Sequence, residues 1–167
     1  TTGDDKITLY LNGSTLPRPN SPPNNLNPTT PLTIAENQSI GTVVGEFNAT
    51  DPDAGATLTY QLVSGAGDGN NSLFTLETNG TLKTATTFDY ETNASTYFIR
   101  VQAKDEFNAS VEGNFTVTLT NIVESFGLVL SAGLGGTVSG AGSYAEGSVA
   151  NITATPASGY QFMHWTG

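Results

Sequence analysis

The chain has 167 residues, and its 15 acidic side chains outnumber five lysine and arginine residues, which gives a formal net charge of −10. This charge argues against nucleic acids and anionic membranes as partners, because their phosphates would repel the chain. The chain has no cysteine and one histidine, so it offers neither disulfide bonds nor the usual nitrogen and sulfur ligands of a transition-metal site.

The first predicted element is a strand over residues 6–13, with Ile7, Leu9 and Leu11 on one face. Residues 16–31 hold six of the eight prolines, a composition typical of an extended, semi-rigid linker. We therefore treat residues 1–15 as a separate N-terminal strand segment. Because a free apolar strand edge promotes aggregation, we expect another sheet to cover it.

Residues 32–123 show the alternation of apolar and polar side chains that is typical of β-strands, and no helical period. The predicted inward-facing residues are Leu58, Tyr60 and Leu62, then Tyr97, Ile99, Val101 and Ala103, then Phe115, Val117 and Leu119. The dipeptide Asn79-Gly80 predicts a hairpin with a type I′ turn. The predicted fold class is all-β, with an antiparallel Greek-key sandwich over 32–123.

The composition changes after Ile122, where the acidic, threonine-rich pattern gives way to glycine and alanine. We expect a second, smaller β-module over residues 124–167. Tyr160 and Trp165, in its last stretch, are predicted to pack inward.

Acidic side chains follow the ends of several predicted strands, at residues 36, 51–53, 89–91 and 105. The carboxylates should therefore gather at the two ends of the sandwich. Closely packed carboxylates repel one another unless a cation joins them, and calcium prefers oxygen ligands. The alternative is turn chemistry, in which Asp and Asn side chains bond to the backbone of their own loop.

From about residue 24 to 123 the chain resembles a bacterial-type cadherin repeat. The resemblance rests on Ile34-Ala35-Glu36-Asn37, Ala49-Thr50-Asp51-Pro52-Asp53, Phe88-Asp89-Tyr90-Glu91 and the run from Tyr97 to Asp105. It implies calcium ligands Glu36, Asp89 and Glu91 at the C-terminal end of the sandwich and Asp51, Asp53 and Asp105 at the N-terminal end. The linker motif that completes such sites in cadherins is reduced here to Asn20 before the sandwich and to Asn121 and Glu124 after it. The resemblance therefore implies one or two ions rather than a full cluster of three.

From about residue 126 to 167 the chain resembles the first part of an internalin-type B repeat, a β-grasp-like module of bacterial surface proteins. The residues that carry this resemblance are Gly135-Gly136-Thr137-Val138, Tyr144-Ala145-Glu146-Gly147, Ile152 to Pro156 and Gly159 to Gly167. One more strand closes the sheet in that family, so we expect an incomplete module here. Residues 6–13 of another copy, or of a neighbouring repeat in a longer chain, are predicted to complete it by adding a strand next to Ile152, Tyr160, Phe162 and Trp165. The alternative is that residues 7–11 fold back onto their own module.

Nine Asn-X-Ser/Thr sequons occur in the chain, although a sequence this rich in Asn, Ser and Thr would carry several by chance. Such motifs mark surface loops of secreted proteins. The predicted acceptors for glycosylation are Asn12, Asn48, Asn70, Asn79, Asn93, Asn108 and Asn114.

Catalytic constellations are poorly represented, since His164 alone would have to serve any Ser-His-Asp relay. We therefore predict that the protein is not an enzyme. The predicted function is that of an extracellular structural or adhesive protein, a calcium-stabilised link of a head-to-tail surface filament or repeat stalk, joined by strand complementation between copies. The alternative is a carbohydrate- or surface-binding module of a large secreted adhesin, in which exposed aromatic rings stack on sugars.

Overall fold

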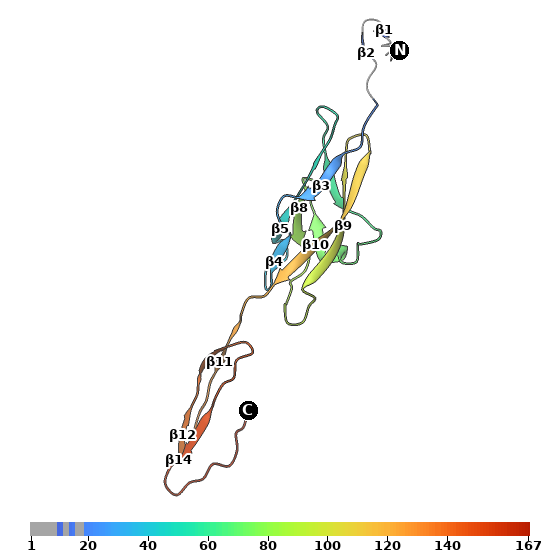
Figure 1. Cartoon of the computed structure of the whole chain (residues 1–167). Helices are drawn as coiled ribbons and strands as arrows, with labels where there is room; N and C mark the ends of the chain where they lie inside the picture. Colours follow the sequence, from blue (N-terminus) through green and yellow to red (C-terminus); the bar gives the residue numbers. More distant parts are fainter. Residues whose placement is uncertain (1–9, 12–13, 16–18) are drawn as a thin grey trace, which may run out of the picture. The chain divides into compact units, whose positions relative to one another are not determined.

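The computed structural model describes residues 10–11, 14–15 and 19–167, and the chain is all-β in this part (Figure 1). Its internal contacts divide it into two units, Thr1–Thr120 and Asn121–Gly167. The described residues include one short 3₁₀ turn, η1 (Asn71–Leu73). None of the described segments forms a helix with the length and apolar character needed to cross a bilayer.

The first unit is a sandwich of two four-stranded sheets. One sheet has the order β4 (Thr33–Ala35), β10 (Ser110–Thr120), β9 (Thr96–Lys104) and β6 (Thr59–Leu62). The other has the order β3 (Asn24–Pro28), β5 (Val43–Thr50), β8 (Thr81–Thr84) and β7 (Phe74–Leu76). The β4–β10 pair is parallel, and every other ladder of the sandwich is antiparallel.

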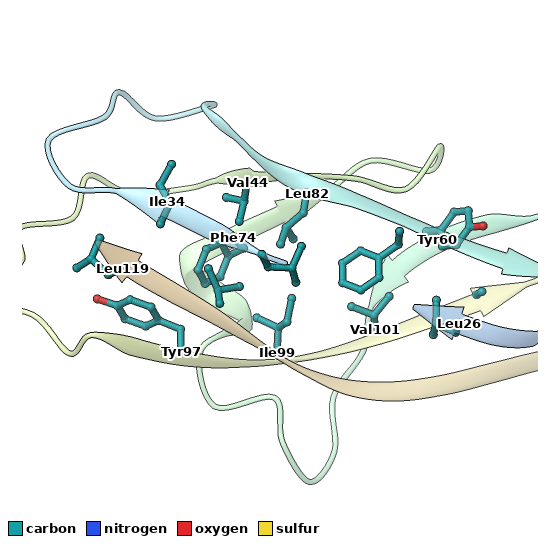
Figure 2. Close-up of a cluster of buried hydrophobic side chains, with 14 of the residues drawn as sticks. Leu26, Ile34, Val44, Tyr60, Phe74, Leu82, Tyr97, Ile99, Val101 and Leu119 are labelled. Atoms are coloured by element: carbon teal, nitrogen blue, oxygen red, sulfur yellow. The ribbon is translucent and has the colours of Figure 1, made fainter. Parts of the chain in front are cut away.

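A single apolar core fills the space between the two sheets (Figure 2). On β9, Tyr97, Ile99, Val101 and Ala103 are buried, while the residues between them are exposed or half-buried. Leu82 on β8 faces them from the other sheet and is fully buried. The alternation on β9 is thus confirmed as the mark of a strand with one face in the core.

Two local features differ from the sequence-based expectation. Strand β3 lies within the proline-rich segment 16–31, and its Leu26 is buried in the core, so part of that segment belongs to the sandwich. The prediction of a type I′ turn at Asn79-Gly80 is wrong. Of these two residues only Gly80 has a positive φ, and its N–H donates to the carbonyl of Glu77 at 2.9 Å. A type I′ turn needs positive φ at both central residues.

The second unit consists of two short antiparallel pairs, β11 (Ser125–Leu128) with β13 (Gly142–Ala145) and β12 (Gly136–Ser139) with β14 (Thr153–Pro156). No residue between 121 and 167 is buried. Near the N-terminus, β1 (Tyr10–Leu11) pairs with β2 (Ser14–Thr15). Ile7 and Leu9, predicted to share a strand face with Leu11, lie outside the described residues.

Candidate metal centre

Glu36 is positioned by the strand pairing at the C-terminal end of the sandwich, where β10 ends. It follows β4 directly, and its N–H donates to the carbonyl of Thr120 at 3.1 Å, which continues the parallel β4–β10 ladder. The side chain is fully buried. A buried carboxylate is costly unless hydrogen-bond donors or a cation compensate it.

Asp89 and Glu91 are carried by the loop that follows the buried Phe88. The N–H groups of Glu91 and Thr92 donate to Asp89 Oδ1 at 3.0 and 3.2 Å, so the Asp89 side chain bonds to the backbone of its own loop. The Tyr90 N–H donates to Glu36 Oε2 at 2.8 Å, although 54 positions separate these residues. This bond ties the acidic loop to the end of β4.

The structure brings the three carboxylates of Glu36, Asp89 and Glu91 together, with one oxygen of each lying within 4.8 Å of the others. Calcium binds oxygens at 2.3–2.6 Å, so two ligands on opposite sides of one ion are about 5 Å apart. The donor set and its spacing therefore fit a calcium ion, with two exposed carboxylates open to solvent and one buried beneath them.

At the N-terminal end of the sandwich, Asp105 follows β9 and is almost fully buried. The N–H groups of Phe107 and Ala109 donate to its Oδ1, each at 2.9 Å, and the side-chain amide of Asn20 donates to its Oδ2 at 2.8 Å. The Ser21 N–H donates to Asp53 Oδ2 at 2.7 Å. Amide donors therefore hold the chain before β3 against this end.

Asp51 completes the N-terminal set. Its Oδ1 accepts the Asp53 N–H at 2.8 Å, whereas its Oδ2 is buried without a hydrogen-bond partner. Such an oxygen is the kind of atom that a cation would satisfy. Among the described residues, however, Asp51, Asp53 and Asp105 do not form an acidic cluster as tight as the one around Glu36. Both calcium coordination and turn chemistry fit this end.

The two remaining predicted ligands, Asn121 and Glu124, lie at the start of the second unit. Sequence reasoning missed the contribution of Asn93, whose Oδ1 accepts the Asp89 N–H at 3.0 Å and braces the acidic loop. The only sequence signal for this contact is the spacing Asp-X-X-X-Asn within a loop, and this spacing is too common in proteins to predict the hydrogen bond.

The predicted acceptor residues of the second unit lie at its surface, which corrects the expectation that Tyr160 and Trp165 pack inward. Tyr160, Phe162 and Trp165 are 61%, 48% and 41% exposed, and Ile152 is 37% exposed. A groove of about 350 Å³ runs between β12, β14 and residues 160–166. The rings of Phe162 and Trp165 lie side by side in it, with centroids 5.4 Å apart.

The predicted glycosylation sites are at the surface of the sandwich. Asn48, Asn79, Asn93, Asn108 and Asn114 are exposed. Asn70 is half-buried, and Asn12 lies outside the described residues.

Two family models match the chain, the cadherin domain over residues 30–120 and the divergent InlB B-repeat domain over residues 126–167. Among curated proteins, the Fat-like cadherin-related tumor suppressor homolog of Drosophila melanogaster is 39% identical over 92 residues. That match covers 53% of this chain and 2% of the relative.

Solved structures show the same fold. The Drosophila N-cadherin EC1-4 structure has a TM-score of 0.50 and 22% identity, over 60% of this chain and 25% of that one. The structure of protocadherin gamma B2 extracellular cadherin domains 1-5 has a TM-score of 0.51 and 24% identity, over 74% of this chain and 26% of that one. The chain thus spans a small part of each relative.

Proposed function

Because the chain belongs to the cadherin domain family over residues 30–120, we propose that it is a calcium-stabilised link of an extracellular structural or adhesive protein rather than an enzyme. The observation that carries this proposal is the convergence of Glu36, Asp89 and Glu91 within 4.8 Å. Three carboxylates so close together repel one another, and this repulsion favours a bound divalent cation.

The residues of the sandwich supply the geometry for such an ion. The Tyr90 N–H fixes Glu36, and the hydrogen bonds within the 89–93 loop hold Asp89 in place. Calcium, when bound, supplies the positive charge that joins the loop to the end of β4. Asp51, Asp53, Asp105 and Asn20 would hold an ion at the other end. Stiffened ends suit a module that transmits force along a chain.

Terbium luminescence tests the calcium site, because terbium replaces calcium and Tyr90 lies within the candidate loop. We expect terbium emission on excitation of tyrosine, competition by calcium, and loss of the signal in the Asp89→Asn, Glu91→Gln double variant. The variant Tyr90→Phe should dim the emission without changing the effect of a chelator on Tm. Calcium at about 100 times its Kd should stabilise the folded state by about 2.7 kcal/mol.

The matched control is Asp68→Asn, which alters an acidic loop outside the cluster, where Asp68 Oδ2 accepts one hydrogen bond from Gly65. It should leave terbium emission unchanged. A Tm that is the same with calcium and with a chelator would contradict the calcium proposal.

We further propose that copies, or neighbouring repeats, join by strand complementation, with residues 6–13 of one link covering the groove of the next. The support is the open groove beside β12 and β14, since a strand laid there would bury the exposed rings of Phe162 and Trp165 and gain backbone hydrogen bonds. Leu11 of β1 already pairs with Ser14, so the donor would use the other edge of its strand. A head-to-tail contact of this kind does not close on itself and propagates into a filament.

The one tryptophan of the chain, Trp165, lies in the groove and reports on this contact. Deletion of residues 1–13 should abolish long assemblies in size-exclusion chromatography with light scattering. Adding a peptide of residues 5–14 to the truncated chain should shift the Trp165 emission to the blue. A peptide with Leu9→Asp should not do so. Assemblies that survive the deletion would exclude this mode of joining.

The exposure of Tyr160 and Trp165 also favours the second candidate, a carbohydrate-binding module, because exposed rings can stack on sugars. Titration of the truncated chain with glycans discriminates between the two functions. Saturable quenching of Trp165 by a glycan, retained in the presence of a chelator, would favour the binding module. No quenching together with the peptide response would favour the structural link.

A further inference from the structure

Six of the nine sequons share a feature that the Asn-X-Ser/Thr motif does not require, which is an acidic residue two positions before the asparagine. The six pairs are Glu46 and Asn48, Asp68 and Asn70, Glu77 and Asn79, Glu91 and Asn93, Glu106 and Asn108, and Glu112 and Asn114. With 15 acidic residues in 167, nine sites would carry about one such residue by chance. All six lie in the sandwich, whereas Asn151 in the second unit has Val149 at this position.

Some of these acidic residues have a structural explanation. Glu77 pairs with Lys83, Glu112 pairs with Arg100, and Glu106 accepts the Thr57 N–H. Glu46 has none, because its carboxylate makes no hydrogen bond or ion pair with any residue that the structure describes. The contacts of the sandwich therefore do not explain the acidic residue at this site, and recognition by another molecule is the better explanation.

Strand β5 presents the Glu46 site on the outer face of its sheet. Phe47 and Ala49 are buried, while Glu46, Asn48 and Thr50 alternate with them and are exposed. The two-residue period of a strand thus places a carboxylate, an amide and a hydroxyl in a row on one face. Within the described part of the chain, the Asn48 side chain has no hydrogen bond to hold it.

The asparagines of four other sites are engaged in the fold. A backbone N–H donates to the side-chain oxygen of Asn70, Asn79 and Asn93, at 2.8, 3.0 and 3.0 Å. The Arg100 guanidinium donates to Asn114 Oδ1 at 3.4 Å. These hydrogen bonds go to the amide oxygen rather than to Nδ2, where a glycan is attached, but they hold each amide in one orientation and limit how it can turn toward an enzyme. Among the sites that the structure describes, Asn48 combines an amide without a hydrogen bond with an acidic residue without a partner.

We propose that the sandwich is a substrate of an oligosaccharyltransferase that reads a carboxylate two residues before the acceptor through a cationic group, and that Asn48 is the main acceptor in the folded protein. In the reaction, Asn48 Nδ2 attacks the anomeric carbon of a lipid-diphosphate-linked oligosaccharide. The Nδ2–carbon bond forms, the bond from that carbon to the phosphate oxygen breaks, the lipid diphosphate leaves, and the amide proton passes to a base. This inference does not depend on calcium binding or on strand complementation.

The test is to incubate the whole chain with a bacterial oligosaccharyltransferase of the acid-dependent kind and its lipid-diphosphate-linked oligosaccharide. Glycopeptide mass spectrometry then gives the occupancy of each sequon. Asn37 and Asn151 are internal comparisons, because Ala35 and Val149 precede them. A peptide of residues 44–52 shows that the enzyme is active.

We expect glycan on Asn48 and little on Asn37 or Asn151. Glu46→Gln, which removes an exposed carboxylate that has no partner among the described residues, should lower the occupancy of Asn48 roughly tenfold. The reciprocal variant Val149→Glu, at a residue that is 79% exposed, should bring Asn151 under modification. Equal modification of Asn37, Asn48 and Asn151, or no effect of Glu46→Gln, would overturn the role of the acidic residue. Modification of the peptide but not of Asn48 in the folded chain would overturn the choice of acceptor.

Discussion

At the N-terminal end of the sandwich, one carboxylate organises much of the local structure. Asp105 is 3% exposed and accepts hydrogen bonds from two loop amides and from the side chain of Asn20. Hydrogen bonds to a buried charged group contribute more than neutral ones, and losing the acceptor leaves its donors without partners.

We predict that Asp105→Ala destabilises the sandwich by about 3 kcal/mol, because three donors lose their acceptor at a buried position. Urea unfolding followed by far-UV circular dichroism in the presence of a chelator measures this without a contribution from calcium. Asp68→Ala is the control, since Asp68 accepts one hydrogen bond in an exposed loop and should cost about 1 kcal/mol or less. Equal costs for the two variants would contradict the role assigned to Asp105.

Glu112 on β10 is the residue whose charge state should affect stability at acidic pH. Hydrogen bonds from Arg100, at 2.6 and 3.0 Å, and from Gln102, at 2.8 Å, lower its pKa below the ordinary glutamate value. A pKa that is lower in the folded state stabilises the fold above the unfolded-state pKa, and this stabilisation disappears as the pH falls through the folded-state pKa.

Glu112→Gln should therefore be less stable than the native chain at about pH 7, and the difference should vanish at about pH 2. Urea midpoints measured across this range test the prediction. Because the pair is at the surface, salt should also reduce the difference. A difference that persists unchanged at acidic pH would show that packing rather than charge is responsible.

At the scale of elements, the β7–β8 hairpin depends on one glycine. Gly80 has a φ of +98°, and a Cβ at this position would lie 2.6 Å from the carbonyl oxygen of Phe47 on the neighbouring strand β5. The Phe47 N–H also donates to the Gly80 carbonyl at 2.8 Å, so the turn is part of the contact with β5.

Gly80→Ala should destabilise the sandwich by about 2–4 kcal/mol, because it combines a left-handed backbone with a clash against main-chain atoms that cannot move away. Gly69→Ala is the matched control: this glycine has no positive φ, and a Cβ added to it would meet nothing within 4 Å, so its cost should stay within about 1 kcal/mol. Thermal unfolding of both variants tests the pair. Similar Tm values would show that the hairpin tolerates a side chain at Gly80.

At the scale of the whole molecule, the two units differ in how much apolar surface they bury. The sandwich has a continuous core that includes fully buried Leu82, Ile99, Val101 and Val117. The second unit has no buried side chain, so little hydrophobic burial offsets the entropy lost on folding.

We therefore expect two separate unfolding transitions. Trp165, which belongs to the second unit, should report unfolding at a lower urea concentration than far-UV circular dichroism, which the sandwich dominates. Calcium should move the later transition and leave the Trp165 transition in place. If one copy covers the groove of the next, higher protein concentration should raise the urea concentration at which Trp165 reports unfolding. A single coincident transition would contradict the independence of the units.

The sequence by itself determined the all-β class, the faces of strands such as β9, and the presence of acidic residues just beyond the strand ends. These features depend on neighbours along the chain, since the two-residue period of a strand can be read without knowledge of any distant segment. The same local reasoning failed at Leu26. The proline content of its segment suggested a linker, but Leu26 lies on strand β3 and is buried in the core.

Only the tertiary structure decided that Glu36 meets Asp89 and Glu91 in a tight cluster, while amide donors occupy Asp53 and Asp105. It also decided that Tyr160 and Trp165 lie exposed beside an open groove. The distance between carboxylates far apart in the chain, and the burial of a ring, depend on how whole sheets pack, and no local pattern of residues contains that information.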